Sequence, residues 1–136
     1  MAERRVLLVE DNDEHAELVE FVLSKTHPDA EFVRKADGQS ALDHLRGCTP
    51  ETSPHLTLLD LKLPGISGIE LLQQLRAEAP CEGLTVVLFT TSNSDRDRAD
   101  ALRARANAFI VKPMDFGQLK ERLETTFHFW LDHAVE

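Results

Sequence analysis

Residues 56–75 read LTLLDLKLPGISGIELLQQL and contain the clearest strand–turn–helix pattern in the chain. Its first part, Leu56 to Leu59, is a short run that is predicted to be a strand buried on both faces. The run leads directly into Asp60, and the turn Leu63-Pro64-Gly65 follows. After the turn, apolar residues return at helical spacing, and Pro80 marks the end of that helix. The stretch therefore predicts a buried strand, a polar turn and a helix whose inner face carries Leu71, Leu72, Leu75 and Ala79.

The same alternation of strand and helix occurs five times along the chain. The other predicted strands are Arg5 to Val9, about Glu31 to Lys35, Leu84 to Phe89 and Ala108 to Val111. The apolar stripes predicted for the other helices are Leu18, Phe21 and Val22; Ala41, Leu42 and Leu45; Ala99, Leu102 and Ala106; and Phe116, Leu119, Leu123, Phe127 and Trp130. Gly47 and Asn107 are predicted to end the second and fourth helices. Because such alternation builds a parallel sheet covered on both faces, we expect an α/β fold of the doubly wound (βα)5 type.

Composition and charge narrow the class of protein. A chain of 136 residues and 15.3 kDa forms one domain, whose core needs no disulfide or metal. Its two cysteines, Cys48 and Cys81, lack the spacing of a metal site. No apolar run is long enough for a membrane span, and the start does not resemble a secretory signal, so we expect a soluble, cytoplasmic protein. The net charge of −9 argues against direct binding to nucleic acid.

The residues that end the predicted strands form the candidate site. Glu10 and Asp11 follow the first strand, Asp60 the third and Lys112 the fifth, while Thr90 ends the fourth. In doubly wound sheets, sites form at the carboxyl ends of the strands, so we expect these side chains to converge at one edge. Carboxylate oxygens suit Mg²⁺, which also binds phosphate oxygens. The pattern therefore predicts a site for phosphoryl chemistry.

Each of these residues has a chemical role in such a site. Asp60, at the end of the central strand, is the candidate nucleophile, because a carboxylate can attack phosphorus to give an aspartyl-phosphate. Glu10 and Asp11 supply the negative charge that holds Mg²⁺. Lys112 is predicted to contact phosphate as a point charge. The Thr90 hydroxyl is predicted to donate to a phosphate oxygen that exists only in the modified state.

Separated motifs along nearly the whole chain resemble the receiver domain of two-component response regulators. They are Val6-Leu7-Leu8-Val9-Glu10-Asp11, the run from Leu58 to Gly68, Thr90, and Val111-Lys112-Pro113. The resemblance implies a flavodoxin-like sheet of strand order 2-1-3-4-5. It also implies that Asp60 accepts a phosphoryl group from a sensor histidine kinase. Such a protein is a phosphoacceptor capable of self-phosphorylation and autodephosphorylation, and not an enzyme that acts on a free substrate.

The resemblance assigns roles to further residues. Lys112 is expected to contact the phosphoryl group, and its peptide bond to Pro113 is expected to be cis. Thr90 and Phe109 are expected to form the switch that responds to phosphorylation. The ligands implied for Mg²⁺, or for Mn²⁺ as a substitute, are Asp11, Asp60, the backbone carbonyl of Lys62 and, through water, Glu10.

A narrower resemblance concerns phytochrome systems. The run Leu88-Phe89-Thr90-Thr91-Ser92 and the ending Phe129-Trp130-Leu131 look like the small single-domain response regulators that pair with bacterial and cyanobacterial phytochromes. This implies a phytochrome-type kinase as partner and a single receiver domain over residues 1–136, with a core of 5–128 and a C-terminal extension of 129–136. Because Phe129, Trp130 and Leu131 continue an apolar helix, we expect a homodimer that covers them. The alternative is a tail that folds back on its own domain.

Other functions fit the pattern less well. An FMN carrier of the same topology needs a Ser/Thr/Gly-rich phosphate loop after the first strand, where this chain has the acidic run Glu10 to Glu14. An aspartate-nucleophile phosphatase needs a second carboxylate two residues after the nucleophile, where this chain has Lys62. A relay or phosphate-sink role stays open beside signalling to an unidentified downstream protein.

The six histidines show no metal spacing and are interpreted as solvated or partly packed. Asp13 and Glu14 are interpreted as carboxylates that favour a helix N-terminus.

Overall fold

The structure is a computed structural model that describes residues 4–78, 81 and 83–132. The strands are β1 (Arg5–Val9), β2 (Glu31–Lys35), β3 (Leu56–Leu59), β4 (Val86–Thr90) and β5 (Ala108–Val111). The α-helices in this part of the chain are α1 (Asp13–Thr26), α2 (Gly38–Arg46), α3 (Gly68–Ala77), α4 (Asp95–Arg103) and α5 (Phe116–Asp132). The strands pair in parallel in the order β2-β1-β3-β4-β5, which confirms the predicted fold and strand order. None of the described helices is both long enough and apolar enough to cross a bilayer.

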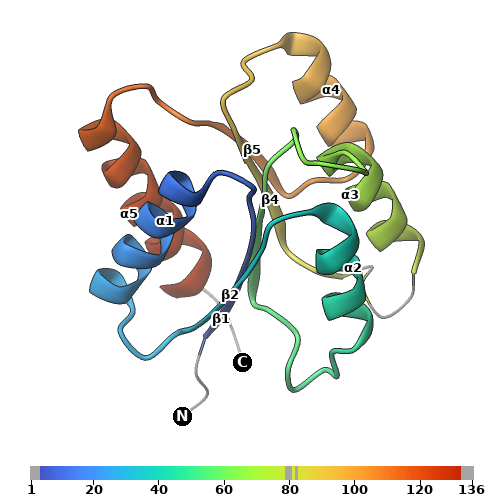
Figure 1. The fold of residues 1–136 in the computed structure, drawn as a ribbon, viewed down its shortest axis with the longest axis horizontal. Coiled ribbons are helices and arrows are strands. Elements are labelled where there is room, and N and C mark those ends of the chain that lie inside the picture. Colours follow the sequence, from blue (N-terminus) through green and yellow to red (C-terminus); the bar gives the residue numbers. More distant parts are fainter. Residues whose placement is uncertain (1–3, 79–80, 82, 133–136) are drawn as a thin grey trace.

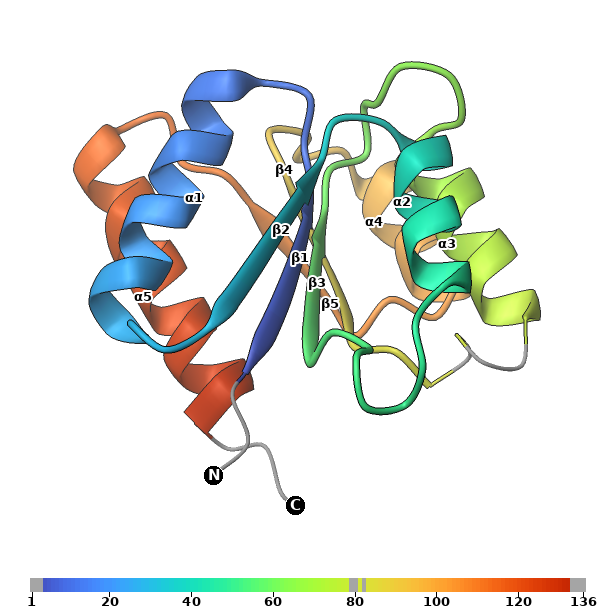
Figure 2. The ribbon, with the colours of Figure 1, turned by 60° about the horizontal axis from the view of Figure 1, so that its bottom comes forward.

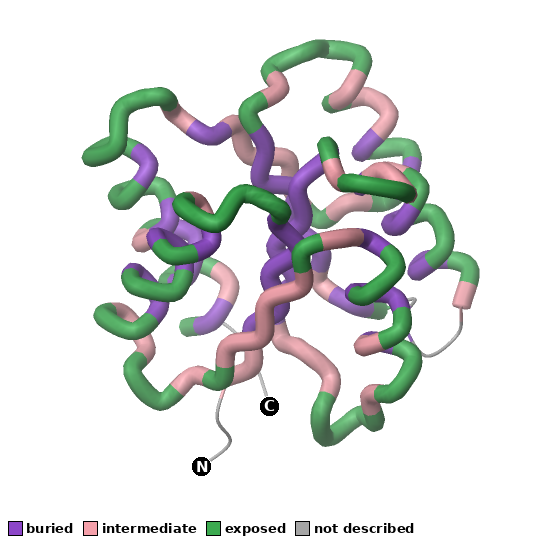
Figure 3. Tube along the Cα trace, in the orientation of Figure 1, coloured by how far each residue is buried: buried purple, intermediate pink, exposed green. Residues whose placement is uncertain are grey.

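The helices cover the two faces of the sheet. α1 and α5 lie side by side on one face, and α2, α3 and α4 cover the other (Figures 1 and 2). Each face has its own cluster of buried apolar side chains, with Val19, Leu123 and Phe127 on the first and Leu42 and Leu71 on the second. Figure 3 shows the buried central strands of the sheet and exposed residues along the outer sides of the helices, while the outer strands β2 and β5 are only partly buried. The hydrophobic burial that stabilises the domain is therefore divided between two layers.

The observed strands begin and end close to their predicted positions. β1, β2, β3 and β5 have the predicted bounds, whereas β4 starts at Val86 and includes Thr90. Leu84 lies outside the sheet because its carbonyl accepts a hydrogen bond from the Arg76 guanidinium at 2.7 Å. The apolar run is therefore longer than the strand that it contains.

Three side chains of the predicted helical stripes are exposed rather than buried. They are Phe21 on α1, Leu102 on α4 and Phe116 at the start of α5. α4 contacts the core instead through Ala101, which is fully buried. Spacing alone identifies a broad apolar stripe, but only the part of it that faces the sheet loses contact with water.

Two predicted helix ends have different outcomes. Gly47 follows α2 as its C-terminal cap, as expected. The left-handed residue after α4 is Arg105, with φ of 69°, and not Asn107. The Asn107 side chain instead accepts hydrogen bonds from the Val86 amide at 2.7 Å and from Arg76 at 3.0 Å, which keeps it in the β4–β5 connection. Ala79 and Pro80, predicted on the inner face and at the end of the third helix, lie outside the described residues.

The Lys112–Pro113 peptide bond is trans, so the predicted cis bond is wrong. The trans form is favoured before proline by about 0.5–1 kcal/mol when no contact selects the cis form. With the trans bond, the Lys112 ammonium already reaches the carboxylates of Glu10 and Asp60. The geometry of the site therefore needs no cis bond here.

The C-terminal aromatic segment is divided between core and surface. α5 continues unbroken to Asp132, so residues 129–132 belong to the helix. Phe127 and Leu131 are buried in the cluster beneath α1 and α5, and Trp130 packs partly against it. The predicted interface role is therefore wrong for Leu131, because a spacing of four residues places it on the same inner face as Phe127. Phe129 remains 56% exposed.

Candidate functional site

The candidate site lies at the carboxyl ends of the central strands. The Asp60 amide donates to the carbonyl of Val9 at 3.1 Å, and the Lys112 amide donates to the carbonyl of Thr90 at 2.6 Å. These bonds continue the parallel ladders just beyond the strands, so the ends of β1, β3, β4 and β5 share one edge. Side chains from distant parts of the sequence meet there as predicted.

Lys112 occupies the centre of the site. Its buried Nζ donates to Glu10 Oε1 at 2.5 Å and to Asp60 Oδ2 at 3.2 Å. A buried charge is costly unless a group of opposite charge and further hydrogen bonds compensate it. Glu10 and Asp60 both compensate the ammonium group, so all three side chains hold one another in place.

Three carboxylates converge beside Lys112. One oxygen from each of Glu10, Asp11 and Asp60 lies within 4.8 Å of the other two. Burial raises the pKa of Glu10, an effect that its hydrogen bond from Lys112 partly offsets. A hard divalent cation such as Mg²⁺ prefers oxygen ligands and would reduce the repulsion between these groups. Because Asp11 is exposed while Glu10 and Asp60 are buried, the group is open to solvent on one side and fits such a cation.

The loop after β3 fixes the position of Asp60. The amide of Lys62 donates to Asp60 Oδ1 at 3.3 Å, whereas the Lys62 side chain is exposed. Gly68, the first residue of α3, lies so close that a Cβ there would stand 2.3 Å from the Asp60 carbonyl oxygen. Only glycine allows this approach of helix and strand end. The candidate nucleophile is thus held by backbone contacts on one side and by Lys112 on the other.

Thr90 and Phe109 lie on neighbouring strands and contact different elements. Thr90 is fully buried, and its hydroxyl oxygen accepts a hydrogen bond from the Ser92 amide at 3.3 Å. The half-buried Phe109 ring lies 4.9 Å from the guanidinium carbon of Arg98 on α4. Such a cation–π contact is worth about 0.5–1 kcal/mol at an exposed position. The Arg98 contact therefore favours the ring position seen here.

His15 also belongs to this site, although the sequence pattern did not single it out. Its Nδ1 lies 3.0 Å from Lys112 Nζ. An ammonium group can only donate, so Nδ1 accepts and the ring is neutral. Burial, with a smaller contribution from the Lys112 charge, lowers the pKa of His15. The sequence signal for His15 is its position just after the acidic end of β1. Asn12 caps the start of α1 by accepting a hydrogen bond from the His15 amide at 3.0 Å, which places the His15 ring in the first turn of the helix, near Glu10.

Comparisons with known proteins cover almost the whole chain. Residues 6–124 match the family model of the response regulator receiver domain, a range that includes all the residues at the carboxyl ends of the strands described in this section. The chain is 35% identical over 128 residues to the probable methanogenesis regulatory protein FilR2 of Methanothrix harundinacea (strain 6Ac), covering 93% of this chain and 83% of that protein. It spans 56% of the length of the phosphate regulon transcriptional regulatory protein PhoB of Escherichia coli, with 34% identity over 133 residues.

Solved structures resemble this one over nearly their full lengths. The phosphorylated cyanobacterial phytochrome response regulator RcpA superposes with a TM-score of 0.92 at 29% identity, covering 98% of both chains. The Mn²⁺-bound form of the response regulator Rcp1 gives a TM-score of 0.90 at 28% identity, covering 97% of both chains.

Proposed function

The chain belongs to the response regulator receiver family, and we propose that its Asp60 accepts a phosphoryl group from a sensor histidine kinase in a Mg²⁺-dependent reaction. The observation that carries this proposal is the buried contact of Lys112 with both Glu10 and Asp60, beside the third carboxylate of Asp11. The phosphorylated protein then signals by binding another protein.

In the proposed reaction, an Asp60 carboxylate oxygen forms a bond to phosphorus while the bond from phosphorus to the kinase histidine nitrogen breaks. The nitrogen keeps the electron pair of that bond. Lys112 already lies beside the attacking carboxylate, where its ammonium group can stabilise a phosphoryl oxygen. Glu10 and Asp11 would provide oxygen ligands for Mg²⁺, and the bound ion would supply positive charge beside the transferred group.

The proposed function does not include turnover of a free substrate. Two residues after Asp60, where aspartate-nucleophile phosphatases need a general acid or base, the chain has Lys62 with an exposed side chain. No carboxylate at that position can activate water. We expect the phosphoryl group to leave Asp60 only by slow autodephosphorylation.

For signalling, we propose that Thr90 and Phe109 report the phosphorylated state. The buried Thr90 hydroxyl would donate to a phosphoryl oxygen. Because this contact exists only in the switched conformation, it can shift the equilibrium from the resting conformation to the switched one. Phe109 would then leave its contact with Arg98 and change the surface formed by α4, β5 and α5. Thr90→Ala should accept phosphate normally and lose phosphorylation-dependent partner binding, whereas unchanged binding would contradict this switch.

The acceptor assignment is tested by labelling with acetyl phosphate and Mg²⁺, followed by mass spectrometry. The original chain should gain one phosphoryl group, and Asp60→Asn should gain none. Asp13→Asn is the matched control, because the Asp13 carboxylate is paired with Arg34 at 2.9 Å and lies outside the carboxylate group. Equal labelling of Asp60→Asn and the original chain would overturn the proposal.

We further propose that the cognate kinase is of the phytochrome type. The support is the similarity to RcpA, a cyanobacterial phytochrome response regulator, over 98% of both chains. In a phosphotransfer time course, a phosphorylated phytochrome kinase should transfer to this chain faster than a kinase with another sensor. Equal rates for the two kinases would contradict this partner while leaving Asp60 as the acceptor.

A further inference from the structure

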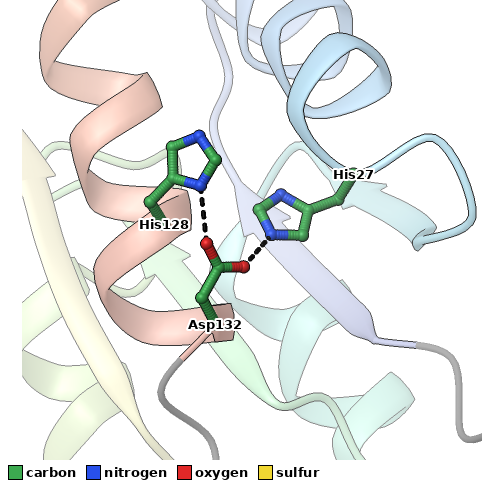
Figure 4. Close-up of side chains that lie close together, drawn as sticks. All are labelled: His27, His128 and Asp132. Carbon is green, nitrogen blue, oxygen red and sulfur yellow. Dashed lines mark hydrogen bonds and ion pairs between the residues drawn. The ribbon is translucent and has the colours of Figure 1, made fainter.

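A second group of potential metal ligands lies where the C-terminal ends of α1 and α5 meet. His27 follows the last residue of α1, and His128 and Asp132 lie on the last turns of α5 (Figure 4). His27 Nε2 is 2.6 Å from Asp132 Oδ1, and His128 Nδ1 is 2.6 Å from Asp132 Oδ2. Ligand atoms of all three residues lie within 4.8 Å of one another. The fold thus brings together two imidazoles and a carboxylate, although His27 and Asp132 are 105 positions apart.

The orientation of His27 is that of a metal-binding histidine. Its Nδ1 lies 2.8 Å from the Thr26 hydroxyl oxygen, while Nε2 points to Asp132. Metal-bound histidines almost always donate their other N–H to an oxygen, which fixes the tautomer and the ring direction. In this structure His27 Nε2 donates to the Asp132 carboxylate, which can only accept. When a metal ion replaces that proton, the neutral ring donates from Nδ1 to Thr26 and its Nε2 lone pair faces the ion.

The two ligands on α5 have a spacing that suits one ion. His128 and Asp132 are four residues apart, so they lie one above the other on the same helix face. Glu124 lies one further turn back, and together with Thr26, His128 and Asp132 it lines a single surface hollow. The His27 side chain is 15% exposed, against 56% for His128 and 46% for Asp132. An ion can therefore enter from solvent and keep a bound water.

We propose that His27, His128 and Asp132 bind Zn²⁺ or a closely similar divalent transition-metal ion. Two imidazole nitrogens and one carboxylate oxygen are a typical three-residue set for zinc, with water as the fourth ligand. Imidazole suits zinc, copper and nickel, whereas Mg²⁺ prefers oxygen ligands, so this group and the acidic group should bind different ions.

Binding requires only a small movement of side chains. Ligands about 2.0–2.2 Å from a tetrahedral zinc ion stand about 3.3–3.6 Å from one another, which is wider than the hydrogen-bonded spacing seen here. The Asp132 carboxylate would therefore withdraw by less than about 1 Å, and the ion would replace its two hydrogen bonds. The half-exposed Asp132 side chain has room for this movement.

A bound ion would cross-link the end of α1 to the end of α5. An ion that joins α1 to α5 closes most of the chain into one loop, and it binds only when both helices are docked. Ligands that bind only the folded state stabilise it by mass action. Zinc should therefore raise the thermal stability of the protein without any contact with Asp60.

The test is a calorimetric titration with Zn²⁺ in the presence of excess Mg²⁺, which keeps the acidic group occupied. The original chain should bind one zinc ion at the proposed site. His27→Gln and His128→Gln should each weaken binding by at least about tenfold, because a metal ligand is lost. His128→Gln keeps the proposal testable if the less exposed His27 is needed for folding. The controls are His44→Gln, a histidine of α2 outside the group, and Asp11→Asn, and both should bind zinc as the original chain does.

A second readout is the midpoint of thermal unfolding. Saturating zinc should raise it by several degrees in the original chain and in both controls, but not in the two histidine variants. The proposal is overturned if no zinc binds in excess Mg²⁺, if both histidine variants bind as the original chain does, or if either control loses the binding. Labelling of Asp60 is measured without zinc, so failure of this site and failure of the proposed function are separate results.

Discussion

At the scale of single residues, the site combines buried charge with one open side. Removing one partner of a buried ion pair commonly costs about 3–5 kcal/mol, so substitutions at Lys112, Glu10 or Asp60 would change stability as well as chemistry. Asp11 differs because it is exposed. It is therefore the residue at which cation binding can be tested with the smallest effect on folding.

Asp11→Asn should weaken Mg²⁺ binding by at least about tenfold, since an ionised ligand is replaced by a neutral one. Asp13→Asn should leave the affinity nearly unchanged, because the Asp13 carboxylate pairs with Arg34 instead. Calorimetric titration with Mg²⁺ measures both, and circular dichroism checks that both variants are folded. Equal losses of affinity would show that the metal lies elsewhere.

His15 predicts a pH dependence of stability. Its pKa is lowered below the ordinary value of 6.5, first by burial and then by Lys112. Well above pH 6.5 the His15 ring is neutral in both the folded and the unfolded chain. As the pH falls below that value, the unfolded chain takes up a proton at His15 more readily than the folded chain. The free energy of unfolding therefore decreases toward acid.

His15→Gln should reduce this loss of stability between pH 7.5 and 5.5. The measurement is the urea midpoint of both proteins at each pH. A comparison at pH 8, where the imidazole is neutral in both states, isolates the effect of the lost contact with Lys112. If both proteins lose the same stability toward acid, His15 is not responsible for any of it.

At the scale of elements, the position of α3 depends on one close contact. The Cβ of an alanine at position 68 would stand 2.3 Å from the Asp60 carbonyl oxygen and 2.8 Å from the Leu61 Cα. Both neighbours are backbone atoms, so the strand end or the helix must move. The contact joins the start of α3 directly to the phosphoacceptor loop.

Gly68→Ala should destabilise the domain by about 3 kcal/mol, the upper part of the usual range for overpacking. It should also slow labelling of Asp60, because the loop that holds the nucleophile is displaced. Gly83→Ala is the control, since its Cβ would meet nothing within 4 Å, and it should leave stability unchanged or slightly raised. Urea unfolding compares the three proteins, and equal midpoints for Gly68→Ala and the original chain would contradict the close contact.

At the scale of the whole molecule, the C-terminal end of α5 exposes an aromatic side chain to solvent. Leu131 packs into the core of its own domain, but Phe129 is 56% exposed and lies edge-on against Trp130 at 4.9 Å between ring centroids. Exposed apolar surface of this kind often marks contacts between proteins. The C-terminal part of α5 therefore has features of both expected arrangements: Leu131 packs back on its own domain, while Phe129 is largely exposed.

We expect a homodimer through the face of α4, β5 and α5, with Phe129 in the contact. Sedimentation at tens of micromolar should detect it, and Phe129→Ser should weaken it without loss of folding, because this side chain is outside the core. Phe21→Ser removes a similarly exposed aromatic from α1 and should leave the dimer intact. A monomeric original chain, with and without modification of Asp60, would rule the dimer out.

Local sequence patterns alone predict the five-fold alternation of strands and helices and the group of residues at the strand ends. Strand runs and turn residues are local signals, and parallel topology then requires the carboxyl ends to share one edge. This is why Glu10, Asp60, Thr90 and Lys112 could be grouped although they are far apart in the chain.

The packing of the elements against one another sets which histidines gain partners and which apolar side chains lose contact with water. His15 reaches Lys112 and His27 reaches Asp132 because α1 docks against the sheet and against α5 in one particular register. Phe129 is exposed and Leu131 buried for the same reason. Helical spacing states which residues share a face, but the packing of one element on another decides what that face meets.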